Sequence, residues 1–428
     1  MGIYEGLQKR EADGNPIRVG LVGCGQMGSG LVHVIRQMSG METCAIADVN
    51  PDRVLATLHR LGIPEHAICA TNDPRKAETG VSGGKVLVTE DALMLAQLPS
   101  LDAVVEATGL TEVGASVAWH CIEASKHVVM LNVETDVTVG PILTQLAEKA
   151  RCVYTVASGD EPGELKRLHD EARLLGFEVV ALGKGKNNTI DFDATPERYY
   201  AEAEGKGMNP KMLSAFKDGS KTMVEMAAVS NATGLVPDVP GMHGPKVQRA
   251  DLQTVFVPKE DGGIFSRRGC VDYTTGRIAP GVFAIVTSND DRVHTDMRFV
   301  GMGDGPYYCL LRPYHLCNIE TPLAIARAVL YSECTVASTR LVSEVVPIAK
   351  RELRPGDIAG EIGCADYLGR IYTYAESARA GSIPIGLTPG GTVTRPIAKG
   401  EMFTATNFAP DTGKFVYKLR ALQDAIGG

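Results

Sequence analysis

A short apolar segment followed directly by closely spaced glycines is the feature that most limits how this chain can fold. Residues 17–22 read IRVGLV, residues 23–28 read GCGQMG, and a helical pattern follows. Glycines at these places allow a tight turn and let the backbone approach a pyrophosphate, which the helix N-terminus attracts. The alternative is a glycine turn that packs without a nucleotide, but the strand–turn–helix context favours a dinucleotide site. The residues expected to contact the dinucleotide are Gly23, Gly25, Gln26, Met27 and Gly28.

Alternating strand and helix patterns continue from this motif to about residue 150. Such alternation is typical of a parallel sheet, and right-handed crossovers then give a doubly wound α/β Rossmann domain. The expected strands cover residues 17–22, 43–49, 101–108, 127–132 and 152–158, and the expected helices cover residues 26–38, 51–61, 114–125 and 141–149.

A chain of 428 residues is longer than one hydrophobic core usually organises. We predict a Rossmann domain over residues 1–157 with returning helices at about 314–345, and an α+β substrate-binding and dimerisation domain over residues 158–313. Short apolar segments with frequent glycines predict a small β-rich domain over residues 346–428. In the second domain, helices are expected near 197–218 and 222–233, and strands are expected to include 281–289 and 297–303.

The composition argues against several classes of protein. A formal net charge of −8 disfavours nucleic acid as a partner, because its phosphates would repel the chain. The ten cysteines are scattered without a CxxC pair, which disfavours a disulfide framework or a structural zinc site. No segment approaches the ~20 apolar residues needed to cross a bilayer. We therefore expect a cytoplasmic protein that binds neither nucleic acid nor a membrane.

An acidic residue ends the expected second strand and bears on the choice of cofactor. Asp48 can accept hydrogen bonds from ribose hydroxyls, which favours NAD. Arg53 is suited to binding the 2′-phosphate of NADPH, or is an ordinary surface residue, so the choice between the two cofactors stays open. Thr108 and Gly109 follow another expected strand and are predicted to line the nicotinamide side, because ligands gather at the carboxyl ends of parallel strands.

Four phrases along the chain resemble the homoserine dehydrogenase group in order and spacing: GLVGCGQMGSGL, VVEATG, HVVMLNVE and LGKGKNN. Near the C-terminus, RPGDIAGEI and GGTVTRPIAKGEMFTATNF resemble the SAF-type module, a small β-clip-like fold. Together these phrases are similar to the 1-deoxy-D-xylulose 5-phosphate reductoisomerase-like branch of the group. The resemblance implies a homodimeric enzyme that uses NADPH to convert 1-deoxy-D-xylulose 5-phosphate to 2-C-methyl-D-erythritol 4-phosphate in isoprenoid precursor synthesis.

The chain departs from the homoserine dehydrogenase pattern at one informative place. That group has an Asn-Lys pair after the strand corresponding to residues 127–132, whereas here Asn132, a predicted cofactor-binding residue, is followed by valine and glutamate. The missing lysine directs attention to Lys184, Lys186 and Asn187, which form a dense set of donors near a strand end. They are suited to holding a phosphate or a polarised carbonyl, and the alternative is a solvated basic turn.

Five further side chains complete the predicted catalytic residues and the candidate metal ligands. Asp160 and Glu161 follow the last expected Rossmann strand and are suited to proton exchange or to a divalent cation, or they simply begin a helix with Pro162 in its first turn. His243, Arg312 and His315 are suited to proton transfer and phosphate binding, although single histidines are more often structural.

Two kinds of function are consistent with these residues. In the first, a reductoisomerase holds a phosphorylated substrate with Lys184, Lys186, Arg312 and His315, and transfers protons through Glu161 or His243. A close variant of it reduces or oxidises another small sugar phosphate, hydroxy acid or homoserine-like substrate without rearrangement. In the second, the chain is a non-catalytic, nucleotide-sensing regulator, which would leave the polar residues near Lys184 without a task.

Overall fold

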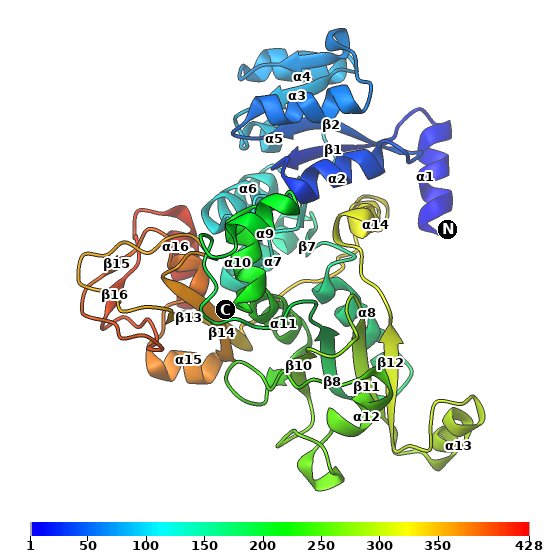
Figure 1. Cartoon of the computed structure of the whole chain (residues 1–428). Helices are drawn as coiled ribbons and strands as arrows, with labels where there is room; N and C mark the ends of the chain where they lie inside the picture. The colour runs from blue at the N-terminus through cyan, green and yellow to red at the C-terminus, as the bar shows by residue number, and fades with distance from the viewer. Residues whose placement is uncertain (1, 428) are drawn as a thin grey trace. The chain divides into compact units, whose positions relative to one another are not determined.

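The computed structural model describes residues 2–427, and the chain divides into two compact units, which we describe separately. Unit 1 consists of Met1–Asp160, Leu316–Thr339 and Lys414–Gly428, and unit 2 consists of Glu161–His315 and Arg340–Gly413. Figure 1 shows the elements of both units. Within the described part of the chain, no helix combines the length and the apolar character that a membrane span requires.

Unit 1 contains a seven-stranded sheet in the order β3-β4-β2-β1-β5-β6-β7, and all of its strand pairs are parallel. The chain completes the half of the sheet made of β1 to β4 and then crosses to the other half at β5, so the switch point lies between β1 and β5. The predicted doubly wound sheet is therefore confirmed. The strands are β1 (Ile17–Val22), β2 (Met41–Ala47), β3 (Ile68–Ala70), β4 (Val86–Thr89), β5 (Ala103–Glu106), β6 (His127–Met130) and β7 (Tyr154–Val156).

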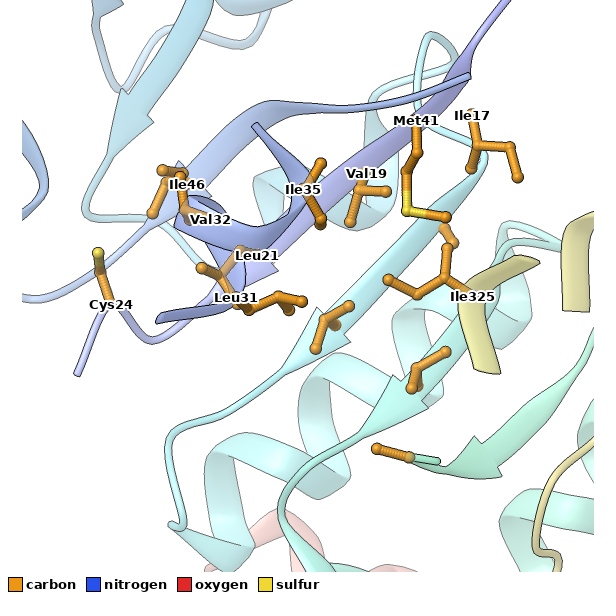
Figure 2. Close-up of a cluster of buried hydrophobic side chains, with 14 of the residues drawn as sticks. Ile17, Val19, Leu21, Cys24, Leu31, Val32, Ile35, Met41, Ile46 and Ile325 are labelled. Carbon is orange, nitrogen blue, oxygen red and sulfur yellow. The ribbon is translucent and has the colours of Figure 1, made fainter. Parts of the chain in front are cut away.

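The core of unit 1 forms where alternate side chains of β1 meet the apolar face of helix α2 (Gln26–Ile35). Figure 2 shows Leu21 of β1 against Leu31 of α2, with Ile325 of α14 reaching the same cluster. Burying each such side chain stabilises the fold by about 1.5–3 kcal/mol. The remaining helices of unit 1 are α1 (Ile3–Ala12), α3 (Pro51–Arg60), η1 (Glu65–Ala67), α4 (Pro74–Ser82), α5 (Met94–Gln97), α6 (Thr111–Glu123), α7 (Val133–Ala150), α14 (Cys317–Tyr331) and α16 (Phe415–Ala425).

Helix α7 starts earlier than the predicted helix over residues 141–149. Asn132 caps it, because the Asn132 side chain accepts a hydrogen bond from the backbone N–H of Thr135. Pro141 therefore lies inside the helix rather than at its start. The prediction placed the boundary at the proline because proline most often occupies the first turn of a helix.

Helix α16, which the sequence analysis did not predict, packs against α6 and α7. Both oxygens of the Glu112 carboxylate accept hydrogen bonds, each 2.9 Å long, from the backbone N–H groups of Phe415 and Val416. In the middle of α16, the guanidinium of Arg420 donates to the carbonyl of Thr138 on α7. A carboxylate of α6 thus caps a helix that comes more than 300 positions later.

Unit 2 contains a five-stranded mixed sheet in the order β12-β11-β8-β10-β9. Helices α8 and α11 pack against the strands of this sheet (Figure 1). A hydrophobic cluster that includes Phe256, Phe265 and Phe283 lies on the face opposite Lys184. The strands are β8 (Glu178–Gly185), β9 (Val236–Pro237), β10 (Cys270–Thr274), β11 (Val282–Thr287) and β12 (Tyr307–Arg312). The helices are α8 (Glu161–Leu174), α9 (Tyr200–Gly205), α10 (Pro210–Lys217), α11 (Ser220–Thr233), η2 (Arg249–Asp251), α12 (Leu252–Val255), η3 (Lys259–Asp261) and α13 (Asp291–Phe299).

The predicted strand over residues 297–303 is wrong, because these residues include the end of helix α13. The side chain of Asp290 caps this helix by accepting hydrogen bonds from the backbone N–H groups of Arg292 and Val293. The apolar pair Phe299 and Val300 suggested a strand, but both side chains are exposed at the helix end.

The C-terminal part of unit 2 is built from short elements, as its sequence indicated. Its strands β13 and β14 pair antiparallel, as do β15 and β16. The predicted SAF-like identity and the predicted domain boundaries stay predictions: residues 346–413 fall within unit 2, and residues 414–428 fall within unit 1. The elements are β13 (Ser343–Ala349), β14 (Tyr367–Thr373), α15 (Tyr374–Ala380), η4 (Ile385–Leu387), β15 (Thr392–Val393) and β16 (Phe408–Ala409).

A buried acid in the core of unit 1 leads to a prediction about stability. Burial raises the pKa of Asp136 to about 6. Hydrogen bonds from Ser338 and Tyr154 act in the opposite direction but are outweighed by burial. The folded carboxyl therefore binds its proton more tightly than the unfolded one, whose pKa is 3.8, so stability falls as pH rises from about 4 to about 6. The variant Asp136→Asn removes this cost: its amide oxygen accepts from one of the two hydroxyls, and its amide N–H donates to the oxygen of the other.

We expect Asp136→Asn to match the native protein in urea unfolding near pH 4 and to exceed it by roughly 2–3 kcal/mol above pH 6.5. Equal stability of the two proteins across this whole range would contradict the prediction.

Candidate active site

The glycine loop of unit 1 has the shape that a dinucleotide requires. Gly23 takes a φ of +93° directly after β1, and a Cβ on Gly28 would lie 1.9 Å from the carbonyl oxygen of Gly23. A Cβ on Gly25, in contrast, would meet no atom within 4 Å, so the backbone is open to a ligand there. Gln26 and Met27 form the first turn of α2. The loop thus fits a pyrophosphate at the N-terminus of α2.

Asp48, one residue past the end of β2, is tied to the same loop. Its carboxylate accepts hydrogen bonds from the backbone N–H groups of Cys24, at 2.7 Å, and Asn50, at 2.8 Å. The guanidinium of Arg53 lies 3.7 Å from the carboxylate and is half exposed. Asp48 therefore holds the glycine loop in place, and Arg53 presents a positive charge to solvent beside it.

Two further predicted cofactor residues form the turn after β5, and a third caps α7. Thr108 donates its hydroxyl and its backbone N–H to the buried carboxyl of Glu106, and Gly109 takes a φ of +71°. The Asn132 side chain caps α7 and also donates to the carbonyl of Leu110, so both ends of its amide have protein partners. These contacts fix the backbone at the carboxyl ends of β5 and β6.

In unit 2, a row of side chains crosses the sheet under helices α8 and α11. Lys184 on β8 is paired with Tyr273 on one side and with Val282 on the other, and Val282 is paired in turn with Arg312 of β12. Residues paired directly across strands share a face of the sheet. The sheet therefore places the cations Lys184 and Arg312 on the same face, two strands apart.

Helices α8 and α11 supply the acids that meet these cations. The ammonium of Lys184 forms ion pairs with the carboxylates of both Glu161 and Glu225, and all three side chains are buried. Burial alone lowers the pKa of Lys184, but the two carboxylates outweigh it and raise that pKa above its ordinary value. The pKa of Glu225 is raised by burial and by the charge of Glu161. Lys184 is thus a buried ammonium held between two acids.

His315 extends this group toward solvent. Its Nδ1 lies 2.8 Å from the carbonyl oxygen of Pro280 and therefore carries a hydrogen, while its Nε2 lies 3.3 Å from Oε1 of Glu161. A hydrogen bond between Nε2 and Oε1 requires a proton on one of these two atoms. His315 and Glu161 therefore form a pair that can share and exchange a proton, and the imidazole remains 14% exposed.

Arg312 is paired within the same unit. Its guanidinium forms an ion pair with the buried carboxylate of Glu164, and it lies over the ring of Tyr314, 4.6 Å from the ring centroid. Glu161 and Glu164 are three positions apart on α8 and so face the sheet together. Arg312 thus faces a protein carboxylate at the place where the sequence analysis predicted phosphate binding.

Lys186 follows the end of β8 and is the lysine best suited to proton transfer near neutral pH. Its ammonium donates to the carbonyl of Phe216. Burial and the neighbouring charge of Lys184 lower its pKa to about 8. Asn187, the next residue, is exposed.

The structure does not bring His243 to the Lys184 group. Its backbone N–H donates to Asp272, and its Nε2 lies 2.8 Å from the Asp238 carboxylate. Asp272 is paired with Gly183, the residue before Lys184, so its side chain points to the opposite face of the sheet. Hydrogen bonds to Asp238 and Asp272 therefore explain the position of His243, and single histidines more often have such a structural role.

Asp160 and Glu161 lie on the two sides of the boundary between the units. The Asp160 carboxylate accepts from the Cys317 thiol at 3.4 Å within unit 1, whereas Glu161 begins α8 in unit 2. Pro162 lies in the first turn of that helix, as predicted. Within unit 2, Glu161 and Glu225 carry carboxylates of the kind that bind a divalent cation, and both are paired with Lys184. The role of Asp160 as a metal ligand stays a prediction.

Sequence reasoning missed Glu164 and Glu225 as parts of this group. Glu225 stands alone in the apolar run MVEMAAV of α11. A charged residue at a buried helical position requires a partner of opposite charge. The acid in this apolar run therefore indicated a buried cation nearby, such as Lys184. Glu164 lies within the phrase SGDEPGE but was not singled out.

The comparison with protein families identifies the region that contains this group. Residues 159–321 match the family described as oxidoreductase DRL, catalytic domain. This match identifies the chain as an oxidoreductase, with a segment similar to the DRL catalytic domain. The match spans α8 to the start of α14 and so includes Glu161, Lys184, Glu225, Arg312 and His315. The predicted enzyme class is thereby confirmed, in preference to the alternative of a non-catalytic regulator.

Among solved structures, the likeness is distant. A probable dehydrogenase from Thermotoga maritima is 14% identical, with a TM-score of 0.43 over 76% of this chain and 91% of its own. A DOX-P reductoisomerase in complex with magnesium is 14% identical, with a TM-score of 0.42 over 74% and 70%. A putative myo-inositol dehydrogenase from Sinorhizobium meliloti 1021 is 12% identical, with a TM-score of 0.40 over 74% and 90%. No curated protein matches the chain.

Proposed function

We propose that this oxidoreductase uses NADPH to convert 1-deoxy-D-xylulose 5-phosphate to 2-C-methyl-D-erythritol 4-phosphate. The observation that carries the proposal is the buried ammonium of Lys184 between Glu161 and Glu225, within the segment that matches the DRL catalytic domain. A permanently protonated lysine in a buried site is suited to polarising a substrate carbonyl. The DRL match supports the reaction class, and the resemblance described above supports the substrate.

Each polar group then has a chemical task. The nicotinamide supplies a hydride when it is bound. Lys184 donates a hydrogen bond to the substrate oxygen on which negative charge develops, and Glu161 in its carboxylate form accepts the proton of a substrate hydroxyl. His315 exchanges that proton with solvent, because its imidazole is partly exposed and lies beside Glu161. Lys186 and Asn187 are the donors at the strand end that we assign to the substrate phosphate.

The pairing of Arg312 with Glu164 favours a second candidate, in which the substrate carries no phosphate. An arginine already neutralised by a buried carboxylate binds a dianion less well than one without such a partner. In that case the enzyme would reduce or oxidise a small hydroxy acid or homoserine-like compound with the same Lys184 chemistry.

The glycine loop supports a nicotinamide dinucleotide in unit 1, and Arg53 supports NADPH over NADH. We expect Arg53→Ala to weaken NADPH binding about tenfold and to leave NADH binding nearly unchanged, as measured by cofactor fluorescence. An equal loss for both cofactors would instead show that Arg53 acts on the glycine loop through Asp48.

The homodimer and the cytoplasmic location remain our proposals, and sedimentation of the purified protein would test the first.

The decisive experiment follows NADPH oxidation by absorbance with 1-deoxy-D-xylulose 5-phosphate, with and without magnesium or manganese. Formation of 2-C-methyl-D-erythritol 4-phosphate would support the proposal, and loss of rate with a chelator would add a metal to the site. Binding of NADPH without turnover of this substrate, but with turnover of a hydroxy acid or homoserine, would favour the second candidate.

A further inference from the structure

A second buried acid, Glu106, lies at the switch point of the unit 1 sheet and has no role in the function proposed so far. It is the last residue of β5, the strand beside β1, and its side chain is fully buried. The following turn touches the glycine loop, because a Cβ on Gly23 would lie 3.0 Å from the backbone of Ala107 and 3.1 Å from that of Thr108. Ligands of doubly wound sheets bind at this switch point.

The side chain of Glu106 holds that turn. One carboxyl oxygen accepts two hydrogen bonds from Thr108, one from its hydroxyl and one, 2.8 Å long, from its backbone N–H. The other oxygen faces Gly114 of α6, where a Cβ would lie 3.1 Å from it and 2.7 Å from the amide nitrogen of Asn132. Strand β5, the turn and the start of α7 therefore meet at this one carboxyl.

The surroundings of Glu106 make its charge variable near neutral pH. Burial raises its pKa to about 7, and the neighbouring charge of Glu134 on α7 acts in the same direction. Hydrogen bonds from Thr108 and Asn132 act in the opposite direction. Tyr154 on β7 also lies within the electrostatic reach of Glu106.

We propose that Glu106 sets which oxidation state of the nicotinamide cofactor unit 1 prefers. The inference rests on the proposed function, since it requires a nicotinamide dinucleotide on the glycine loop. The oxidised nicotinamide ring is a cation and the reduced ring is neutral. A carboxylate at the switch point therefore favours the oxidised cofactor, and a neutral carboxyl group removes this preference. The enzyme releases oxidised cofactor more readily in mild acid than in mild alkali.

The test measures dissociation constants with the full-length protein. Reduced cofactor is followed by its fluorescence and oxidised cofactor by competition, from about pH 6 to about pH 8.5. We expect the ratio of the oxidised to the reduced dissociation constant to fall about tenfold as pH rises. The ratio cancels pH effects that the two forms share, such as titration of a phosphate.

Glu106→Gln retains the acceptor for Thr108 and should give a ratio that is independent of pH. The matched control is Glu123→Gln, which removes an exposed acid of α6 and should behave like the native protein. If Glu106→Gln does not fold, Thr108→Val serves instead, because losing its hydrogen bond should move the midpoint to higher pH.

A ratio that stays constant with pH in the native protein, or that still varies in Glu106→Gln, would overturn the inference and leave the proposed function standing. Failure of the native protein to bind either form of the cofactor would overturn both.

Discussion

Replacing Lys184 with methionine is expected to lower the stability of the protein by about 3–5 kcal/mol and to abolish turnover. Methionine has nearly the length of lysine but no charge, so Glu161 and Glu225 would be left buried without a counter-charge. The loss should be larger at an alkaline pH than at an acidic one, because burial and the charge of Glu161 raise the pKa of Glu225 and so favour its neutral form in acid. Urea unfolding at both pH values measures it.

Two matched proteins separate charge from packing in this experiment. Lys206→Met removes a surface lysine that pairs with Glu202 and should change stability by less than about 1 kcal/mol. The triple variant Glu161→Gln, Lys184→Met, Glu225→Gln should regain most of the lost stability and none of the activity. A Lys184→Met protein as stable as Lys206→Met would contradict the role of the ammonium as the buried counter-charge.

The second large effect is expected at α16. Leu419 is 2% exposed, and Leu419→Ala should lower the stability of unit 1 by about 2–5 kcal/mol. Leu422, on the same helix but 42% exposed, provides the control, because Leu422→Ala should change stability by no more than about 0.5 kcal/mol.

The single tryptophan of the chain reports on this docking directly. The Trp119 ring on α6 meets the Phe415 ring of α16, with centroids 5.7 Å apart. Its fluorescence should therefore follow the unfolding of the α16 contact, with an earlier transition in Leu419→Ala. If the tryptophan signal of Leu419→Ala unfolds at the same urea concentration as that of Leu422→Ala, α16 does not stabilise unit 1.

The parts of the fold that the sequence predicted are those determined by local pattern. The glycines after β1 and the alternation of strands and helices depend on backbone geometry within a few residues, so the parallel sheet could be predicted. Helix α16 could not, because its cap is Glu112, far away in the sequence. Helix α13 was mistaken for a strand because the apolar residues at its end suggested one, although they are exposed.

The candidate site divides in the same way. Lys184, Arg312, His315 and Glu161 were selected as chemically suitable residues near element ends, and strand pairing and α8 bring them to one face of the sheet. Their pairing with acids was not predicted, because it depends on which helix covers that face. His243 was selected on residue type alone, and its position beside Asp238 shows why residue type does not determine location.

The late position of α16 in the chain has a consequence for biosynthesis. Because α16 lies far behind α6 and α7 in the sequence, it leaves the ribosome long after them, and the strip of α6 and α7 that it covers stays open until residues 415–425 have been made. Unit 1 therefore cannot be completed before unit 2 has been synthesised. Chaperones have a defined window in which to hold this strip, and a nascent chain stalled before residue 415 exposes it to quality control.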